Sequence, residues 1–534
     1  MDRAAVFGTA GWGFEPLRAH QILPLPKSER ILLWSTAALS LVLRAVAFFN
    51  YRFDADEQQH LHVTWGWTAG LVQYRDYFDN HAPLFHLITA PLLALLGERS
   101  DILHWMRVPM LLLFAVVLWA TYVIGKTLYD ERIGLWAAVL VSLFPPFFLK
   151  SLEFRTDNLW NTLWMVALVL LIRDRSPLLI GLILGCTLAT SLKTSLLVIT
   201  IVVAALFAKR SVDWLKVAIG FVIVPVALLL FFAAVGAWDE LVYCTVTFNG
   251  NVALTRKNIW IQRAIFPFTA AALVWLAWRF RRTDWRYFFA VAMGVFAVVL
   301  AGFWALISPR DFLPLMPLAA IFGAAALTRA RQPLRALAAT IVVFTAALWY
   351  YGDRFQNKTA WHTTMLDQVL RLSHPGEPLI DHKGETIYRP RPHYFIFENI
   401  TRAQIARGII KDTLPEDVVR TRTHVAQADG AMWPPQARAF LSANFVDLGR
   451  LRASGQWIKE DGAFTIAVPG EYVILDANGE AKGVLNGLPY GGARELAAGA
   501  YRFERAVPNE PVVVLWAPAY RRGHSPFHLR DREF

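Results

Sequence analysis

The sequence predicts a polytopic α-helical membrane protein with about eleven transmembrane helices, followed by a soluble C-terminal domain rich in β-strands. Of 534 residues, 56% are hydrophobic and 18% are charged, and the mean hydropathy is +0.38. Charged residues make up about a quarter of an average soluble domain. Long apolar runs recur from Ile31 to Tyr351, and hydrophobicity falls afterwards. Because about 20 apolar residues cross a bilayer, we expect residues 31–351 to form a membrane domain.

The charge and the cysteines exclude other classes. The formal net charge is +12, but lysines and arginines cluster in short links between apolar runs. This distribution is typical of the positive-inside rule rather than of a nucleic-acid-binding surface. Only Cys186 and Cys244 are present. They indicate neither a disulfide framework nor a thiolate metal site.

Residues 1–30 are polar and basic and precede an apolar run from Ile31 to Phe49. No small-residue cleavage site follows this run, which favours an uncleaved first membrane helix over a signal peptide. The N-terminal segment should therefore be cytoplasmic.

Two later segments decide the helix count. Residues 82–97 are apolar but short, and residues 178–208 are too long for one helix at about 1.5 Å per residue. If 82–97 only dips into the outer leaflet and 178–208 forms two helices that meet near Lys193, lysine and arginine are about twice as frequent on the inner side. This gives eleven helices. The remaining spans are expected at about 102–124, 133–149, 158–172, 214–235, 263–279, 286–307, 312–328 and 334–351.

The first outer loop, residues 50–101, contains an unusually ionisable stretch between Phe53 and Leu84. A simple linker between helices has no structural need for so many acids and histidines. In the eleven-helix arrangement, other charged segments lie on the same side, including 152–157, Lys193 and 308–312. This convergence predicts one extracytoplasmic site. The ionisable residues of the stretch include Asp54, Asp56, Glu57, His60, His62, Asp76, Asp79 and His81.

A loop carboxylate can act as a general base, bind a divalent cation, or simply be solvated. Solvation is the usual role. Asp56 and His60 are four residues apart and would lie one turn apart on a helix, so the pair could share a ligand.

The order of motifs resembles the GT-C glycosyltransferases, and among them the protein O-mannosyltransferase and aminoarabinose transferase family. An acidic pair stands in the first outer loop as Asp56-Glu57, followed by Gly70 through Tyr74 and Asp76, and a Pro-Leu pair opens an apolar helix. The resemblance covers residues 30–350 and is weak in the C-terminal domain. The matching residues also include His81-Ala82-Pro83-Leu84, Arg155-Thr156-Asp157, Lys193 and Arg310-Asp311-Phe312-Leu313-Pro314.

The resemblance implies inverting sugar transfer from a polyprenyl-phosphate sugar to an acceptor hydroxyl. Asp56 would be the general base and Glu57 its support. Cations should stabilise the leaving phosphate, and the candidates are Arg155, Lys193, Arg310 and His81. Arg310 is favoured because a planar guanidinium can bind two phosphate oxygens. For Lys193, anchoring a helix at the headgroup level is an equal alternative.

The chain also departs from the family pattern. It has Asn80-His81-Ala82-Pro83 where aminoarabinose transferases have Glu-Lys-Pro-Pro, so the second carboxylate is missing in register. This leaves open whether a divalent cation takes part; no other cofactor is indicated. Asp157 could instead pair with Arg155 or cap a helix that starts at Asn158. Weaker candidates for acceptor, sugar or metal binding are Asp54, His60, Asp79 and Asp157.

Residues 352–534 should form an extracytoplasmic domain with a helix near 360–372 and antiparallel strands from about 455, where apolar and polar residues alternate. This domain would shape the acceptor site or dock on the membrane part. Expected partners are the polyprenyl-phosphate sugar, a lipid, glycan or protein acceptor, and membrane lipids, but no nucleic acid. A nucleotide-sugar donor is disfavoured because no nucleotide-binding βαβ pattern is present.

Two other classes stay open, a multi-pass transporter and a non-enzymatic scaffold with an outer β domain. A transporter would place charges at mid-helix and show related halves, whereas here the charges cluster at outer helix ends. The expected location is the bacterial inner membrane, with the active site and C-terminal domain on the periplasmic or extracellular side.

Overall fold

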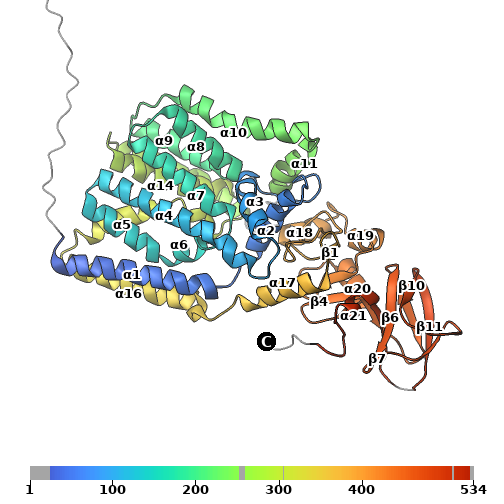
Figure 1. Cartoon of the computed structure of the whole chain (residues 1–534). Coiled ribbons are helices and arrows are strands. Elements are labelled where there is room, and N and C mark those ends of the chain that lie inside the picture. Colours follow the sequence, from blue (N-terminus) through green and yellow to red (C-terminus); the bar gives the residue numbers. More distant parts are fainter. Residues whose placement is uncertain (1–24, 252–258, 305, 508–509, 530–534) are drawn as a thin grey trace, which may run out of the picture.

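The computed structural model describes residues 25–251, 259–304, 306–507 and 510–529. Most of the expected cytoplasmic segment, residues 1–24, lies outside the described residues. The chain has a helical bundle and a C-terminal part of mixed helices and strands at one end of it (Figure 1).

Helical segments lie at all eleven expected spans, but the span 133–149 is broken at Phe144 into two helices, and the helix within 312–328 starts only at Met316. Residues 178–208 are divided into two helices at 191–193. Within the described residues, α1, α4, α10, α14 and α16 are long and apolar enough to cross a membrane, and further apolar helices are shorter. The number of crossings stays a prediction. The helices are α1 (Lys27–Asn50), α2 (Ala55–Thr68), α3 (Leu84–Leu96), α4 (Ile102–Leu128), α5 (Glu131–Leu143), α6 (Pro145–Lys150), α7 (Thr156–Ile172), α8 (Pro177–Thr190), α9 (Thr194–Phe207), α10 (Trp214–Ala234), α11 (Trp238–Val242), η1 (Tyr243–Thr247), α12 (Phe248–Gly250), α13 (Ile259–Arg279), α14 (Trp285–Phe303), η3 (Pro309–Phe312), α15 (Met316–Leu327), α16 (Pro333–Tyr351) and η4 (Asp353–Phe355).

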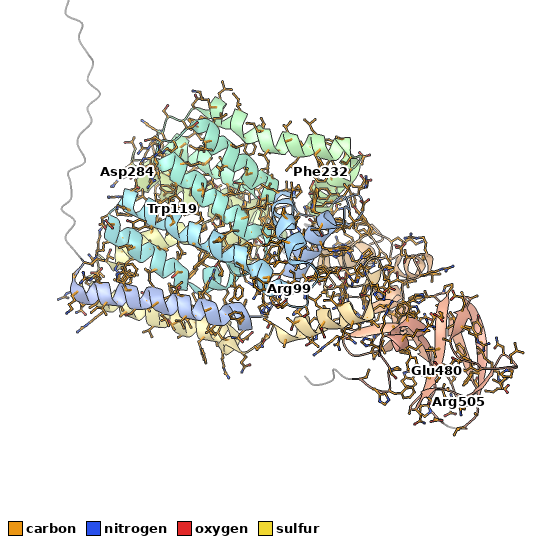
Figure 2. All side chains as sticks on the ribbon, in the orientation of Figure 1. Arg99, Trp119, Phe232, Asp284, Glu480 and Arg505 are labelled. Atoms are coloured by element: carbon orange, nitrogen blue, oxygen red, sulfur yellow. The ribbon has the colours of Figure 1, made fainter. Side chains whose placement is uncertain are left out.

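The bundle carries large apolar side chains on its outside, as lipid-facing helices do. Trp119 on α4 is 48% exposed and projects from the bundle (Figure 2). Inside, α8 and α10 approach closely because Gly181 and Gly185 face the α10 backbone and Gly220 faces the α8 backbone, leaving no room for a Cβ atom. Small residues allow such close helix packing in membranes. These features describe an integral membrane protein.

The first outer loop folds into α2 and α3. A capping box starts α2: the Asp54 side chain accepts a hydrogen bond from the Asp56 amide, and Glu57 accepts one from the Asp54 amide at 2.8 Å. The loop backbone therefore presents Asp54, Asp56 and Glu57 in three different directions. At 13 residues, or about 20 Å, α3 is shorter than a bilayer core, which agrees with the expectation for residues 82–97.

The C-terminal part contains the expected helix, α17, and two sheets. Strands begin earlier than residue 455, since β1 to β3 and the start of β4 precede it. These early strands have only two or three residues and alternate with helices, so they give no period-2 pattern. The elements are α17 (Ala360–Leu372), β1 (Leu379–Ile380), α18 (Asn399–Ala406), α19 (Leu414–Arg420), β2 (Val425–Gln427), α20 (Pro435–Asn444), β3 (Phe445–Asp447), β4 (Leu451–Trp457), β5 (Ala463–Ile466), β6 (Gly470–Asp476), β7 (Gly479–Glu480), β8 (Gly483–Leu485), β9 (Leu488–Pro489), β10 (Arg494–Leu496), β11 (Gly499–Arg505), β12 (Val513–Trp516) and α21 (Ala517–Arg521).

The larger sheet has the order β1-β2-β4-β12-β6-β10, with β3 beside β4 and β7 beside β6. Only β1 and β2 pair in parallel within it, and in its centre Val514 faces Gln456 on β4 and Ile474 on β6. The smaller sheet has the order β5-β11-β8-β9. The apolar residues of β4, β6 and β12 form the core of this part.

The segment between β1 and α18, residues 381–398, packs directly on the first outer loop. The amide of Arg99 donates to the hydroxyl of Tyr388 at 3.2 Å, and Arg389 pairs with Glu98 at 2.8 Å. His62 on α2 bonds to the carbonyl of Ile387 at 2.9 Å. Arg99 lies at this junction between bundle and C-terminal part (Figure 2). The C-terminal part therefore contributes directly to the surroundings of the loop.

Candidate active site

A charged cavity of about 660 Å³ lies where α2, α7, α9 and η3 meet the first outer loop. Six site candidates from the sequence line it: Asp56, His81, Arg155, Asp157, Lys193 and Arg310. They come from widely separated parts of the chain, so the predicted convergence of outer loop ends is present. The lining also includes Asn80, Thr156, Ser191, Thr245, Asn249, Trp304, Ser308, Asp311 and Ile400.

The Asp56 carboxylate lies between positively charged side chains. Its Oδ2 accepts a hydrogen bond from Arg155, and its Oδ1 accepts one from Lys383. The nearest nitrogen of Arg310 is 3.9 Å from Oδ2. Burial disfavours a charged carboxylate, but Arg155 and Lys383 outweigh this effect and hold the pKa of Asp56 well below its usual range. Asp56 is therefore ionised at neutral pH.

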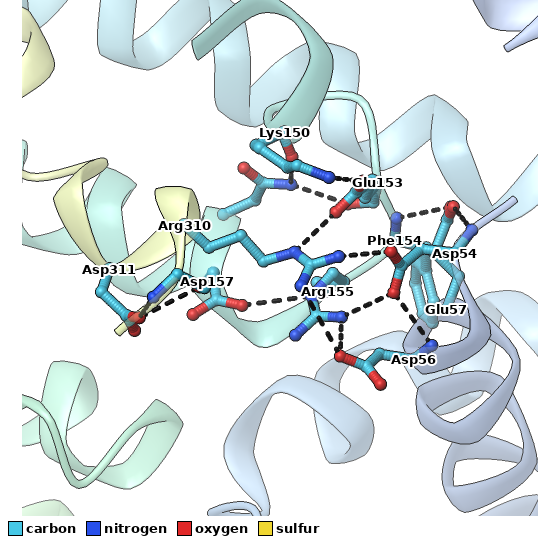
Figure 3. A network of polar contacts seen from close by, with 12 residues as sticks. Asp54, Asp56, Glu57, Lys150, Glu153, Phe154, Arg155, Asp157, Arg310 and Asp311 are labelled. Carbon is cyan, nitrogen blue, oxygen red and sulfur yellow. Dashed lines mark hydrogen bonds and ion pairs between the residues drawn. The ribbon is translucent and has the colours of Figure 1, made fainter. Parts of the chain in front are cut away.

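Arg155 and Arg310 are held by carboxylates on their other edges (Figure 3). Arg155 donates to Asp54 at 3.0 Å and to Asp157 at 3.2 Å. Arg310 donates to Glu153 at 2.9 Å and also to Asp54. Among the described residues, Nη2 of Arg155 and Nη1 of Arg310 have no hydrogen-bond acceptor. Each guanidinium therefore keeps donors for a ligand in the cavity.

Lys193 lies between two acids, donating to Asp157 at 2.6 Å and to Asp311 at 2.7 Å. Asp311 is itself fixed by the capping box of η3, in which the Ser308 amide donates to it at 2.7 Å. Asp157 thus pairs with Arg155 and Lys193, as one sequence alternative expected. It does not cap α7, which starts at Thr156 without a side-chain cap. Lys193 lies in the cavity wall, which favours a site role over a headgroup anchor.

Glu57, expected beside Asp56 as its support in catalysis, does not line the cavity. The side chain is fully buried and forms a bidentate pair with Arg107 on α4, at 2.6 and 2.8 Å. It also accepts the amide of Phe154 at 2.9 Å. Both carboxylate oxygens are used inside the protein, so Glu57 positions α2 against α4 and the 151–155 loop.

Asp79, expected as an acceptor, sugar or metal contact, is also fully buried. It accepts hydrogen bonds from Gln73 at 2.7 Å and Gln59 at 3.2 Å, and it pairs with Nδ1 of His81 at 2.8 Å. His81, in contrast, is 27% exposed and lines the cavity. With Nδ1 directed to the carboxylate, Nε2 is the His81 nitrogen left for a ligand. Asp79 therefore orients His81.

The expected sharing of a ligand by Asp56 and His60 is not found. His60 is fully buried, and its ring bonds to His86 at 2.9 Å, while Asp56 faces Arg155 and Lys383. Burial beside His81 and His86 holds the pKa of His60 well below its usual range. Asp54, a weaker candidate from the sequence, caps α2 and accepts hydrogen bonds from Arg155 and Arg310.

Three functional residues were missed by the sequence reasoning. Lys383 comes from a segment without apolar periodicity, and nothing local indicates its long-range contact. Glu153 lies in the charged 152–157 segment, where it was a visible but unassigned acid. Arg107 stands inside an apolar run, and a charge at such a position signals a buried partner. Lys383 brings the C-terminal part into contact with Asp56.

Among the described residues, no group of three or more histidine, cysteine, aspartate or glutamate side chains has the geometry to hold a metal ion. The carboxylates around Asp56 are instead arranged against arginine and lysine. The two cysteines are free thiols, with Cys244 buried and Cys186 half-buried.

Comparison with known proteins gives two findings. Residues 80–238 match the family model described as dolichyl-phosphate-mannose-protein mannosyltransferase. The fold is similar to the crystal structure of ArnT from Cupriavidus metallidurans bound to undecaprenyl phosphate, with a TM-score of 0.56 and 14% identity, over 80% of this chain and 98% of that one. The apo structure of the same protein gives 0.54 and 13%, with the same coverage. No curated protein sequence matches the chain.

The family match begins at Asn80 and contains His81, Arg155, Asp157 and Lys193 of the cavity wall. The chain thus has a fold of the GT-C glycosyltransferase type, and residues 80–238 match the model of the mannosyltransferase family.

Proposed function

We propose that the chain is an inverting membrane glycosyltransferase that moves a sugar from a polyprenyl-phosphate donor to an acceptor hydroxyl on the extracytoplasmic face of a bacterial inner membrane. One observation carries this proposal. Ser308 lines both the charged cavity and an apolar groove of about 650 Å³ between α5, α15 and α16. A charged cavity and an apolar groove that share a wall residue fit a ligand with a phosphate head and a hydrocarbon tail.

The groove is suited to the prenyl chain. Its walls include Leu140 of α5, Phe144 directly after that helix, Met316 of α15 and Phe344 of α16. Burial of apolar chain in such a groove contributes roughly 0.8 kcal/mol for each CH₂ removed from water. The similar ArnT structure was solved with undecaprenyl phosphate, a ligand of this class.

The phosphate then lies at the start of η3, where Arg310 and Arg155 present their remaining nitrogens. Charge-assisted hydrogen bonds from guanidinium to phosphate are among the strongest in proteins. Lys193 and Nε2 of His81 complete the wall. As the bond from the anomeric carbon to the phosphate oxygen breaks, negative charge develops on the phosphate, and these donors are already in place to stabilise it.

Asp56 serves as the general base. The acceptor hydroxyl gives its proton to the Asp56 carboxylate, its oxygen bonds to the anomeric carbon, and polyprenyl phosphate leaves from the opposite face of the sugar. The configuration at the anomeric carbon is therefore inverted. Because Arg155 and Lys383 now occupy both oxygens of Asp56, the acceptor hydroxyl has to replace one of them. Loss of the Lys383 contact raises the basicity of Asp56 at the moment when an acceptor arrives.

Substrate consumption by the purified protein in lipid nanodiscs tests this proposal. Polyprenyl-phosphate sugars are compared with nucleotide sugars that carry the same sugars, and release of polyprenyl phosphate is measured. Consumption of a lipid-linked sugar is expected. Consumption of nucleotide sugars alone would contradict the proposed donor class.

A further inference from the structure

A second cavity, of about 480 Å³, lies beside the active cavity and is lined mainly by the C-terminal segment 391–420. Cavities of about 300 to 1,000 Å³ commonly hold small-molecule ligands. This cavity is distinct in its lining from the charged one, because it contains neither Asp56 nor any residue proposed to bind the donor phosphate.

Its most unusual feature is Arg391, a half-buried arginine that lines the cavity. Nε and Nη1 of this side chain are buried without a hydrogen-bond partner. The nearby Asp381 balances part of the Arg391 charge, but its own hydrogen bonds come from the Gly384 amide and from the amide and hydroxyl of Thr386, at 2.6 to 3.0 Å. Buried donors without acceptors are costly. Arg391 therefore marks a place where a ligand supplies the missing acceptors.

His393 is the second unpartnered group. The residue is 6% exposed, lines the same cavity, and neither ring nitrogen has a hydrogen-bond partner. Burial next to Arg391 lowers its pKa to about 3, so the ring is neutral at physiological pH. A neutral imidazole offers one donor and one acceptor. This combination is complementary to a hydroxyl group.

The remaining wall is aromatic, with Tyr243, Tyr394, Phe395 and Phe397. Aromatic faces pack against the C–H face of a sugar ring and leave its hydroxyls free to bond elsewhere. The acids in the lining are already neutralised, because Asp76 pairs with Arg75 at 2.9 Å and Asp417 with Arg420 at 2.7 Å. Among the lining side chains, the charged groups left outside these two pairs are the cations Arg391 and Lys411.

Two elements separate this cavity from the active cavity and contribute to both. The helix α18 places Ile400 in the active cavity and Ile405 in the second one, about 7 to 8 Å apart along its axis. The π-helix η1 places Tyr243 in the second cavity and Thr245 in the active one. One extended molecule could therefore reach both sites around this wall.

We propose that the second cavity is a subsite for a saccharide residue bearing an acidic group, located on the acceptor next to the residue that receives the sugar. Arg391 binds the acidic group, His393 binds a ring hydroxyl, and the aromatic wall packs on the ring. This inference rests on the proposed function for its biological role, because the acceptor is defined by the transfer reaction. The binding site itself rests only on Arg391, His393 and the cavity.

Ligand-observed NMR on the purified full chain in nanodiscs tests the binding site separately from the proposed function. The probes are methyl glucuronide, the matched neutral methyl glucoside, and inorganic phosphate. We expect methyl glucuronide to bind at least about tenfold more tightly than the other two, because charge-assisted hydrogen bonds to Arg391 are available only to the acid and ring packing only to the sugars. Equal binding of all three probes, or tighter binding of inorganic phosphate, would overturn the proposal.

Variants locate the binding. Arg391→Gln should weaken glucuronide binding at least about tenfold, whereas the matched change Arg494→Gln on the distant strand β10 should not. Since a half-buried arginine can matter for folding, Ile409→Trp provides a second test: Ile409 is an exposed lining residue, 48% accessible, and a larger ring there blocks the cavity. Unchanged binding in folded Ile409→Trp protein would contradict the subsite. Parent protein that binds methyl glucuronide as expected but transfers no sugar from any polyprenyl-phosphate donor would show that only the proposed function is wrong.

Discussion

Lys383 and Asp56 are 327 residues apart in the sequence, and the ammonium group of Lys383 contacts Oδ1 of Asp56. Lys383 also pairs with Glu398 at 3.1 Å, at the end of the segment that contains Arg391 and His393. The C-terminal part thus acts on the proposed catalytic carboxylate through one side chain. In the proposed reaction this contact is replaced by the acceptor, so acceptor binding and activation of the base are coupled.

Replacing Lys383 should change the pH dependence of catalysis. In Lys383→Met protein one of the cations that depress the pKa of Asp56 is absent, so that pKa rises. The acid limb of the kcat/KM profile should move to higher pH by the same amount. The exposed Lys482→Met serves as control. An unshifted acid limb in Lys383→Met would argue against the coupling.

Arg310→Lys should reduce donor turnover. A lysine keeps the charge but cannot bond Glu153, Asp54 and a phosphate oxygen together. We expect kcat/KM for the donor to fall by about 10² to 10³. The matched change is Arg335→Lys, at an exposed position in the first turn of α16 and outside the cavity wall. It should have no effect on donor kinetics. Donor kinetics within a factor of three of the parent protein would remove Arg310 from the phosphate site.

The buried pair of Glu57 and Arg107 should dominate the stability of the first loop. Glu57→Gln leaves the Arg107 charge buried without its partner, which costs about 3 to 5 kcal/mol and lowers the melting temperature. The half-exposed pair of Glu131 and Lys126 offers a control, because Glu131→Gln should cost less than about 1 kcal/mol.

A second change distinguishes pairing from packing. The double variant Glu57→Gln with Arg107→Met should be more stable than Glu57→Gln alone, since the unpaired charge is gone. A double variant that is less stable by the full sum of both changes would mean that the two side chains do not interact.

Glu385 predicts a pH-dependent stability. Burial and the nearby Asp381 raise its pKa to about 7 from 4.5. The unfolded chain therefore releases this proton first as pH rises, and the folded state loses stability between about pH 4.5 and 7. Glu385→Gln removes this loss. The free energy of unfolding of the variant minus that of the parent should therefore be about 2 to 3 kcal/mol larger at pH 8 than at pH 4.5. Unfolding curves at both pH values check this, and equal differences at the two pH values would contradict it.

Much of the architecture follows from local sequence patterns. Apolar length marked the helices, and the positive-inside bias put the charged helix ends on one side, so Asp56, Arg155, Lys193 and Arg310 could be expected to meet before any distance was known. They line one cavity.

Other features depend on contacts that no local pattern encodes. An acid in a charged loop looks the same whether it faces a cavity, like Asp56, or a buried arginine, like Glu57. The role of Glu57 could be inferred only by pairing it with Arg107 in a later helix. The short strands β1 to β3 and the reach of Lys383 depend on how the C-terminal part docks on the loop, which is decided by tertiary packing.

The rate of sugar transfer by Asp56→Asn protein tests the central claim most directly. Asn keeps the size of the side chain but cannot take the acceptor proton, so kcat should fall by about 10² to 10⁴ while donor affinity is retained. Asp101→Asn, which changes a partly exposed carboxylate of the same outer loop, should transfer at the parent rate. Transfer by folded Asp56→Asn protein within about tenfold of the parent would contradict the role of Asp56 as the general base.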